Sequence, residues 1–216
     1  MSDLLYTVFT NIAPKHEEEF NAWQETEHGP YLITLPGYQS VIRYKDCDTP
    51  HRYANFWHIS SMKDFENPER LVRAKTPWGN YLSPYRDRRI DFYVQDQGLE
   101  AAPPSAELAD AFLLLVADSY SDEEDRASSI TSHVRARLAQ LRAIQNVMDV
   151  RIYHGYQGKG IAENYVFYYL SCSLQTAETD TLPRIDALLG EAGKKMNRTR
   201  MTCYSQNSKV KAIQTK

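Results

Sequence analysis

The pattern of hydrophobic positions in the first half of the chain predicts four strands and two helices. β-Branched and aromatic residues cluster, as is typical of strands, at residues 4–12, 38–45, 52–59 and 89–95. After the first strand, Pro14 suits the first turn of a helix whose apolar stripe holds Phe20 and Trp23. A capping sequence at residues 61–64 begins a second helix before the last strand. The predicted order of elements is βαββαβ.

The second half repeats this order with little residue identity. Its strand-like segments are residues 110–119, 146–156, 164–174 and 198–208. Ile130, Val134, Leu138 and Leu141 follow the first of them at helical spacing, and a last helix is expected to end at Gly193. The recurrence of one order of elements indicates a tandem duplication.

A polar stretch that contains Pro and Ala, at residues 96–107, is the best candidate for a linker between the halves. We therefore expect two domains, residues 1–98 and 108–216. A sheet with its helices on one face leaves the other face bare, and a second sheet is the natural cover for it. The sequence thus predicts an α+β fold in which two tandem βαββαβ units pack sheet to sheet within one chain.

The composition is that of an ordinary globular protein. Of 216 residues, 42% are hydrophobic, and 25 Lys and Arg against 28 Asp and Glu give a net charge of −3. The three cysteines are widely spaced, and the sequence has neither a signal-like N-terminus nor an apolar run that could cross a membrane. We therefore expect a cytoplasmic protein with no membrane partner. The basic residues near the C-terminus do not alternate with aromatic residues, so nucleic acid is not an expected partner.

One part of the first half carries a family resemblance. The motif Glu-His-Gly-Pro at residues 27–30, followed by a Pro-Gly turn at 36–37, resembles the end of the first helix in EthD-like members of the dimeric α/β-barrel superfamily. The resemblance covers roughly residues 4–95, and the second half agrees only in the order of its elements. It implies ferredoxin-like units that form an α/β barrel, with an aromatic ligand pocket between helices and sheet. It does not imply one reaction, because that superfamily includes monooxygenases, cyclases, dehydratases, lyases and haem-degrading enzymes.

His28 and Glu27 are the candidate catalytic residues. The resemblance implies an acid–base role for His28. Pro30 disfavours helical geometry at the preceding residue, so we expect the imidazole at a helix C-terminus, where its protonated form is stabilised. Ideal helix geometry places Glu27 on the aromatic stripe beside Trp23, where desolvation would raise the pKa of its carboxyl group. Simpler interpretations are a histidine that caps the helix and a glutamate that faces water.

The third strand divides by alternation into two sets of residues. These are Tyr53, Asn55 and Trp57 on one face, and Ala54, Phe56 and His58 on the other. Two aromatic residues with a neutral amide are typical of a ligand-binding surface, so we expect the first set to face the helices and any pocket. Asn55 would then orient a carbonyl or phenol, and Trp57 would stack on a ring. If the second set faced the pocket, His58 would join His28; ordinary core packing is the third interpretation.

Further candidates for substrate binding lie before the fourth strand. Trp78 and Tyr81 belong to a segment with Pro and Gly that could cover the pocket. Arg88 and Arg89 lead into the strand, and one of them could bind a carboxylate or an enolate; we favour Arg89. The expected substrate-binding set is completed by Trp23 and Tyr31.

These residues favour a cofactor-independent enzyme that acts by proton transfer on a small aromatic or polyketide-like compound, as a lyase, dehydratase or cyclase. Two alternatives stay open: a cofactor-free monooxygenase of a phenolic substrate, and a non-catalytic small-molecule-binding or stress-response barrel. The histidines are scattered without metal-ligand spacing, so no metal site is expected, and we expect no cofactor. The chain could also form a homodimer.

Overall fold

The computed structural model describes residues 4–49, 51–67, 77–95, 112–118, 130–156, 164–194 and 197–203. They fall into two compact units, with the division between Tyr93 and Val94. The predicted linker at residues 96–107 lies outside the described residues, so the predicted domain limits at 98 and 108 stay predictions. No helix in the described part of the chain is long and apolar enough to cross a membrane.

The first unit is a sheet with the strand order β4-β1-β3-β2. Its strands are β1 (Leu4–Ile12), β2 (Tyr38–Asp46), β3 (Arg52–Ile59) and β4 (Arg86–Gln95). Both β1 and β2 pair with β3 in the antiparallel sense. On the other side of β1, the hydroxyl of Thr7 donates a hydrogen bond of 3.3 Å to the carbonyl of Asp91 on β4. These strands agree closely with the predicted segments.

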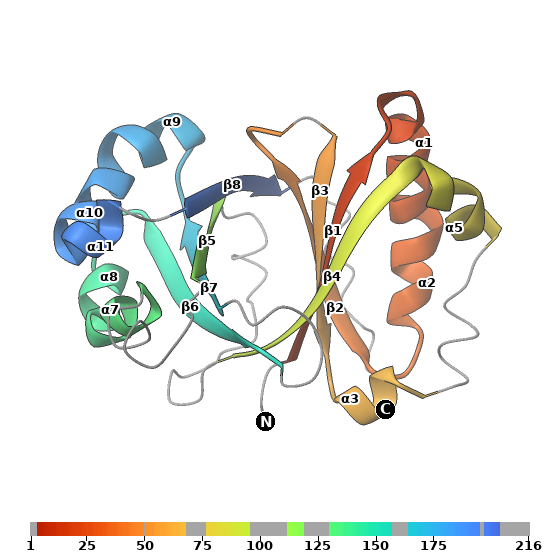
Figure 1. The fold of residues 1–216 in the computed structure, drawn as a ribbon, viewed down its shortest axis with the longest axis horizontal. Coiled ribbons are helices and arrows are strands. Elements are labelled where there is room, and N and C mark those ends of the chain that lie inside the picture. The colour runs from red at the N-terminus through yellow and green to blue at the C-terminus, as the bar shows by residue number, and fades with distance from the viewer. Residues whose placement is uncertain are drawn as a thin grey trace. The chain divides into compact units, whose positions relative to one another are not determined.

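Helical segments cover one face of this sheet (Figure 1). They are η1 (Pro14–His16), α1 (Glu17–Trp23), η2 (Gln24–His28), α2 (Gly29–Ile33), α3 (Met62–Phe65), α5 (Pro77–Leu82) and η3 (Ser83–Tyr85). Phe20 and Trp23 of α1 pack with Tyr53 of β3 and Leu82 of α5 in one buried cluster. The aromatic stripe of the predicted helix therefore packs α1 against the sheet.

The first helix does not end at His28, so that prediction is wrong. α1 continues through η2, a π-helical turn, into α2, and His28 itself has helical dihedral angles (φ −68°, ψ −49°). In the π-helical turn the N–H of Gly29 bonds to the carbonyl of Gln24, five residues earlier. Proline removes an N–H and crowds the carbonyl four residues before it. The wider turn accommodates Pro30 without breaking the helix.

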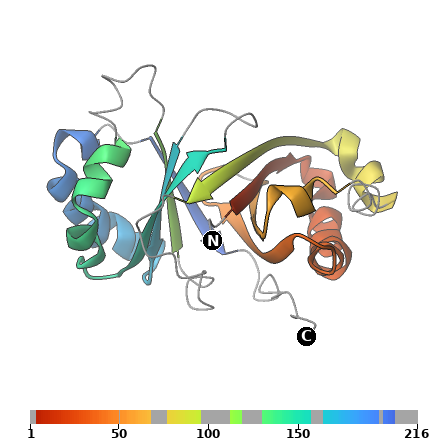
Figure 2. The same cartoon turned by 90° about the horizontal axis from the view of Figure 1, so that it is seen from below.

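The second unit has the strand order β8-β5-β7-β6. Its strands are β5 (Phe112–Asp118), β6 (Val147–Gly155), β7 (Asn164–Leu170) and β8 (Asn197–Cys203). Its helical segments are α7 (Ile130–Ala136), α8 (Leu138–Arg142), α9 (Leu174–Thr176), η5 (Ala177–Thr181), α10 (Leu182–Leu189) and α11 (Glu191–Lys194). Figure 2 shows these helices on one face of their own sheet. α10 ends before Gly190, which has a φ of +63°, rather than at Gly193 as predicted.

In each unit the strands lie side by side in the order fourth, first, third, second. The α+β class is therefore confirmed. In the second unit, aliphatic side chains such as Leu114, Val150, Val166 and Ile185, all fully buried, fill the space between sheet and helices. In the first unit, part of the space between sheet and helices is a cavity.

Candidate functional site

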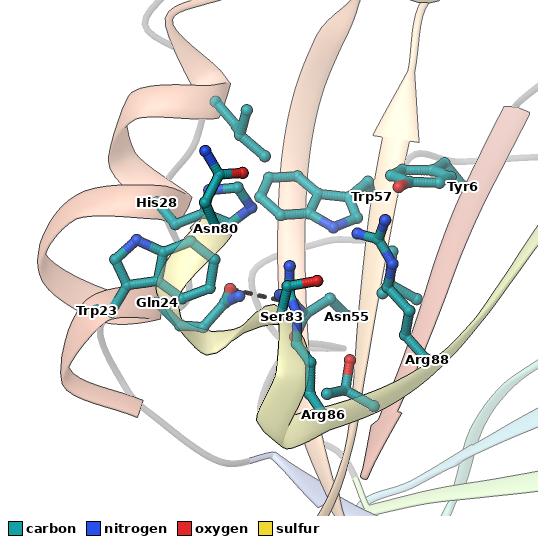
Figure 3. Close-up of a pocket in the computed structure, with 13 residues that line it drawn as sticks. Tyr6, Trp23, Gln24, His28, Asn55, Trp57, Asn80, Ser83, Arg86 and Arg88 are labelled. Carbon is teal, nitrogen blue, oxygen red and sulfur yellow. Dashed lines mark hydrogen bonds between the residues drawn. The ribbon is translucent and has the colours of Figure 1, made fainter. Parts of the chain in front are cut away.

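A cavity of about 410 Å³ lies between the helices and the sheet of the first unit (Figure 3). It is lined by Tyr6, Val8, Thr10, Trp23, Gln24, His28, Leu32, Asn55, Trp57, Asn80, Ser83, Arg86 and Arg88. A volume of several hundred Å³ is ordinary for a site that takes a small molecule. The lining combines aromatic rings, neutral amides and two guanidinium groups.

The sheet contributes alternate residues of neighbouring strands to this cavity. Tyr6 of β1 lies opposite Trp57 of β3, and Val8 lies opposite Asn55. Because alternate residues of a strand share a face, the strand register places these side chains together. The structure thus places Asn55 and Trp57 on the helix-facing side, the orientation favoured from the sequence. Phe56 points the other way and packs on Phe9, with ring centroids 6.0 Å apart.

The π-helical turn η2 brings Trp23 and His28 together. Their rings stack with centroids 4.2 Å apart and planes 23° apart, although the residues are five positions apart. In an α-helix such a pair would diverge by about 140°, whereas a π-helical turn places them almost one above the other. His28 also meets the Trp57 ring edge to face at 6.4 Å. The same turn leaves Glu27 exposed and outside the cavity, so its predicted place on the aromatic stripe is wrong.

His28 is held as a neutral imidazole. Burial, and to a smaller extent the positive charges of Arg86, Arg43 and Arg88, together lower its pKa to about 3. The expected stabilisation of the imidazolium at a helix C-terminus is therefore wrong, because the helix continues and three guanidinium groups lie nearby. Nδ1 of His28 is buried and has no hydrogen-bond partner among the described residues.

Two arginines of β4 form the cationic side of the cavity. Arg86 and Arg88 alternate on the strand, and their side chains rise toward Asn55 and Trp57 (Figure 3). The guanidinium of Arg86 lies 5.5 Å from the centre of the Trp23 ring. Burial and the charge of Arg88 lower the pKa of Arg86. The described residues that line the cavity include these two guanidinium groups and no carboxylate, a composition that favours an anionic or electron-rich ligand.

Arg89 does not line the cavity, contrary to the prediction. Because it directly follows Arg88 on β4, and successive side chains of a strand point to opposite faces, its side chain projects from the other face. There its Nε donates to Asp91 at 2.6 Å, and its guanidinium lies 5.6 Å from the centre of the Phe9 ring. Arg88, the arginine not favoured from the sequence, takes the predicted place.

Two further predicted substrate-binding residues do not line the cavity, and for a third the prediction stays a prediction. Tyr31 and Tyr81 do not line it. Tyr81 is 48% exposed and meets the rings of His16 and Tyr85. The side chain of Trp78 lies outside the described residues. Sequence reasoning also missed Tyr6, Val8 and Thr10, whose alternation along β1 could have been matched to that of β3.

Comparisons with known proteins agree on the fold. No family model and no curated protein matches the chain. An anthrone oxidase-like protein matches with a TM-score of 0.60 at 13% identity, over 98% of this chain and 93% of that one. A candidate monooxygenase from Fusobacterium nucleatum gives 0.60 at 8% identity over 94% and 93%, and a haem-binding protein from Thermus thermophilus gives 0.55 at 12% over 96% and 93%. At these identities the likeness shows the fold alone.

Neither His28 nor His154 is well placed to ligate a haem iron. A haem iron needs an axial ligand with open, flat space beside its nitrogen. The indole rings of Trp23 and Trp57 occupy the space around His28, one stacked on its ring and one at 84° to it. The ring nitrogens of His154 face Asn164 at 2.9 Å and Arg135 at 3.4 Å. No group of three potential metal ligands occurs in the described part of the chain.

Proposed function

We propose that this chain is an enzyme that acts on a small, planar aromatic or polyketide-like compound in the cavity of the first unit. The rings of Tyr6, Trp23 and Trp57 around a volume of about 410 Å³ support a ring-shaped ligand. The observation that carries the proposal is that these aromatic rings and the guanidinium groups of Arg86 and Arg88 line one cavity. A buried cationic, aromatic site lowers the pKa of a bound phenol or enol and favours its anion.

His28 is the proposed base that forms this anion. A neutral imidazole can accept the substrate proton, and the resulting imidazolium is offset by the negative charge that appears on the substrate. Its low pKa in the free protein comes from burial and from Arg86, Arg43 and Arg88. An anion in the cavity neutralises part of that positive field. Proton transfer and substrate binding are therefore coupled in the proposed mechanism.

Oxygenation is the reaction that this site supports best. An electron-rich enolate or phenolate can react with O₂ directly, without a cofactor. Proton loss from a CH₂ group gives a carbanion, addition of O₂ and a proton gives the hydroperoxide, and loss of water leaves a carbonyl: R₂CH₂ + O₂ → R₂C=O + H₂O. The similarity in fold to an anthrone oxidase-like protein and to a candidate monooxygenase supports this choice. Cyclisation, dehydration or lyase cleavage would begin with the same proton transfer and stays as the second candidate.

Oxygen consumption tests the proposal and separates its two reactions. The purified chain is mixed with anthrone, and O₂ uptake and product are followed together. We expect one O₂ for each carbonyl formed, and His28→Ala should lower turnover by about 10²- to 10⁴-fold. Glu27→Gln, a change in the exposed neighbour, should leave turnover within a factor of about two, because solvated side chains outside a site contribute little. Turnover that survives in His28→Ala would remove the histidine from the mechanism.

A non-catalytic barrel is the remaining alternative. It predicts that phenolic compounds bind to the cavity and are released unchanged, so binding without product formation would favour it. For the whole chain we propose, as the sequence predicts, a tandem duplication of ferredoxin-like units packed sheet to sheet. We also propose that the chain is related to EthD-like proteins. A cytoplasmic location and a homodimer also stay proposals.

A further inference from the structure

A buried arginine next to the cavity determines the orientation of two asparagine side-chain amides. Arg43 of β2 is 2% exposed and lies opposite Asn55 in the strand register. Its Nε donates to Oδ1 of Asn55 at 3.2 Å, and its terminal nitrogen donates to Oδ1 of Asn21 at 2.9 Å. A guanidinium can only donate hydrogen bonds. Both asparagines must therefore turn their oxygen atoms toward Arg43.

The orientation of Asn55 then determines that of Gln24. With its oxygen engaged, Asn55 has only its NH₂ group left, and this donates to Oε1 of Gln24 at 3.2 Å (Figure 3). Gln24 is 3% exposed and lines the cavity. Its oxygen is turned to Asn55, so its NH₂ group is the polar end left for a ligand. The cavity thus receives a hydrogen-bond donor from a side chain that could equally have presented an acceptor.

The other end of the same chain of bonds is anchored at a carboxylate. The NH₂ group of Asn21 donates to the hydroxyl of Tyr53 at 2.9 Å, and that hydroxyl donates to Glu17. Burial alone would raise the pKa of Glu17, but hydrogen bonds from Tyr53, Lys45 and His51 lower it to about 2. Glu17 therefore remains an acceptor at neutral pH. The direction of each hydrogen bond from Gln24 to Glu17 is therefore defined.

We propose that Arg43 is a positioning residue that sets the polarity of the cavity, so that the site selects planar ligands carrying an accepting oxygen, as a ketone, phenolate or carboxylate. Arg43 acts through Asn55, and the NH₂ group of Gln24 contacts the ligand oxygen beside Arg86 and Arg88. The inference rests on the proposed function, because it assumes that a planar aromatic compound occupies this cavity. It adds that the edge of the compound carrying an accepting oxygen is recognised, and that a hydrogen-bond donor recognises it.

Two neutral probes of nearly equal shape measure this polarity. 2-Acetylnaphthalene carries an accepting oxygen, and 2-ethylnaphthalene carries none. Their affinities for each variant are compared by titration, and the ratio of the two affinities is followed so that differences in hydrophobicity cancel. The isosteric change Asn55→Asp keeps an acceptor for Arg43 but gives Gln24 a second acceptor instead of a donor. Gln24 must then turn round and present its oxygen to the ligand.

We expect Asn55→Asp to lower the ketone-to-hydrocarbon ratio by about 2- to 10-fold, the effect of one lost hydrogen bond. Asn11→Asp is the matched control, because Asn11 is exposed and does not line the cavity, so the same exchange adds a charge without removing a donor from the site. Since both probes are neutral, the ratio should change little in this variant. Arg43→Met should lower the ratio, whereas Arg43→Lys, which still donates, should retain most of it.

The outcomes separate this inference from the proposed function. If wild-type protein binds neither probe, the aromatic site and the inference both fail. If both probes bind and Asn55→Asp leaves the ratio unchanged, or lowers it no more than Asn11→Asp does, the polarity inference fails while the aromatic site stands. Loss of the preference in Asn55→Asp and Arg43→Met, with retention in Arg43→Lys, supports it.

Discussion

At the residue scale, the charge state of His28 links the site to the stability of the fold. Its pKa is about 3 in the folded chain, because of burial and the nearby charges of Arg86, Arg43 and Arg88, against about 6.5 when exposed. Between these values the unfolded chain binds a proton at this residue and the folded chain does not. Above pH 6.5 the titration of His28 therefore does not lower the free energy of unfolding. As the pH falls from 6.5 toward 3, that free energy decreases.

A pH comparison of His28→Gln with the wild type tests this linkage. From pH 7.5 to pH 5.0 the wild type should lose about 2 kcal/mol more of its free energy of unfolding than the variant, because about 1.4 kcal/mol is lost per pH unit below 6.5. Urea unfolding at the two pH values measures the difference. Equal losses in both proteins would mean that His28 titrates near its ordinary value in the folded chain.

The sequence predicted single residues of the site when their position followed from local rules. Asn55 and Trp57 follow from alternation along one strand, and the structure places both at the cavity. The charge of His28 does not follow from such a rule. It depends on guanidinium groups of Arg43 and Arg86, which come from other strands and are distant in sequence. Alternation gave no basis for choosing between Arg88 and Arg89, since the inward face of β4 was not known.

At the element scale, the π-helical turn η2 is the part of the site that sequence patterns could not predict. An α-helical period of 100° per residue places Glu27 beside Trp23, and the structure places Gln24 and His28 at the cavity instead. One wider turn is enough to change which side chains face inward. Its cause is local, because Pro30 can follow only if the preceding carbonyls are rearranged.

Gly29→Ala tests the turn, because two physical rules predict opposite results. Helix propensity alone predicts a gain of about 1 kcal/mol in stability, since Gly29 has ordinary helical dihedral angles. A Cβ at this position, however, would lie 2.8 Å from the backbone oxygen of Gln24, and the backbone must shift to relieve the contact. We expect a net loss of about 1–3 kcal/mol, as for other overpacked sites. Thermal and urea unfolding measure it.

A second glycine provides the control for this experiment. Gly190 ends α10 in the second unit at a φ of +63°, and a Cβ there would meet nothing within 4 Å. Gly190→Ala should lower stability through backbone strain by about 1–2 kcal/mol. Only Gly29→Ala should also weaken binding of aromatic probes, because it displaces Gln24 and His28. A stabilised Gly29→Ala variant with normal binding would contradict the role given to the turn.

At the scale of the whole molecule, the two units share a strand order but differ in the side chains on the helix-facing side of the third strand. In the second unit the helix-facing side of β7 carries Val166 and Tyr168, fully buried in an aliphatic core. The corresponding side of β3 carries Asn55 and Trp57 around a cavity. The order of elements was predictable because hydrophobic periods report it directly. The cavity depends on side-chain volumes contributed by several elements together, and no single hydrophobic pattern in the sequence predicts that sum.

Both units also bury aromatic residues on the sheet face away from their helices. In the first unit Phe9 and Phe56 are 7% and 2% exposed, and in the second Tyr153 and Phe167 are 0% and 2% exposed. Such faces would be unfavourable in water, at about 25 cal/mol for each Å² of apolar surface. The proposed packing of one sheet on the other would cover both aromatic faces.

Cutting the chain between its halves tests that packing. A protease site inserted near residue 104, inside the predicted linker, is cleaved in the intact folded protein, and the products are separated by size under native conditions. If the two aromatic faces cover each other, the fragments should elute together at the mass of the uncut chain and separate only in denaturant, because hydrophobic association does not require a covalent link. The uncut variant with the same insertion is the control. Fragments that separate as soluble monomers would show that each sheet is covered in some other way, and the proposed intrachain barrel would then be wrong.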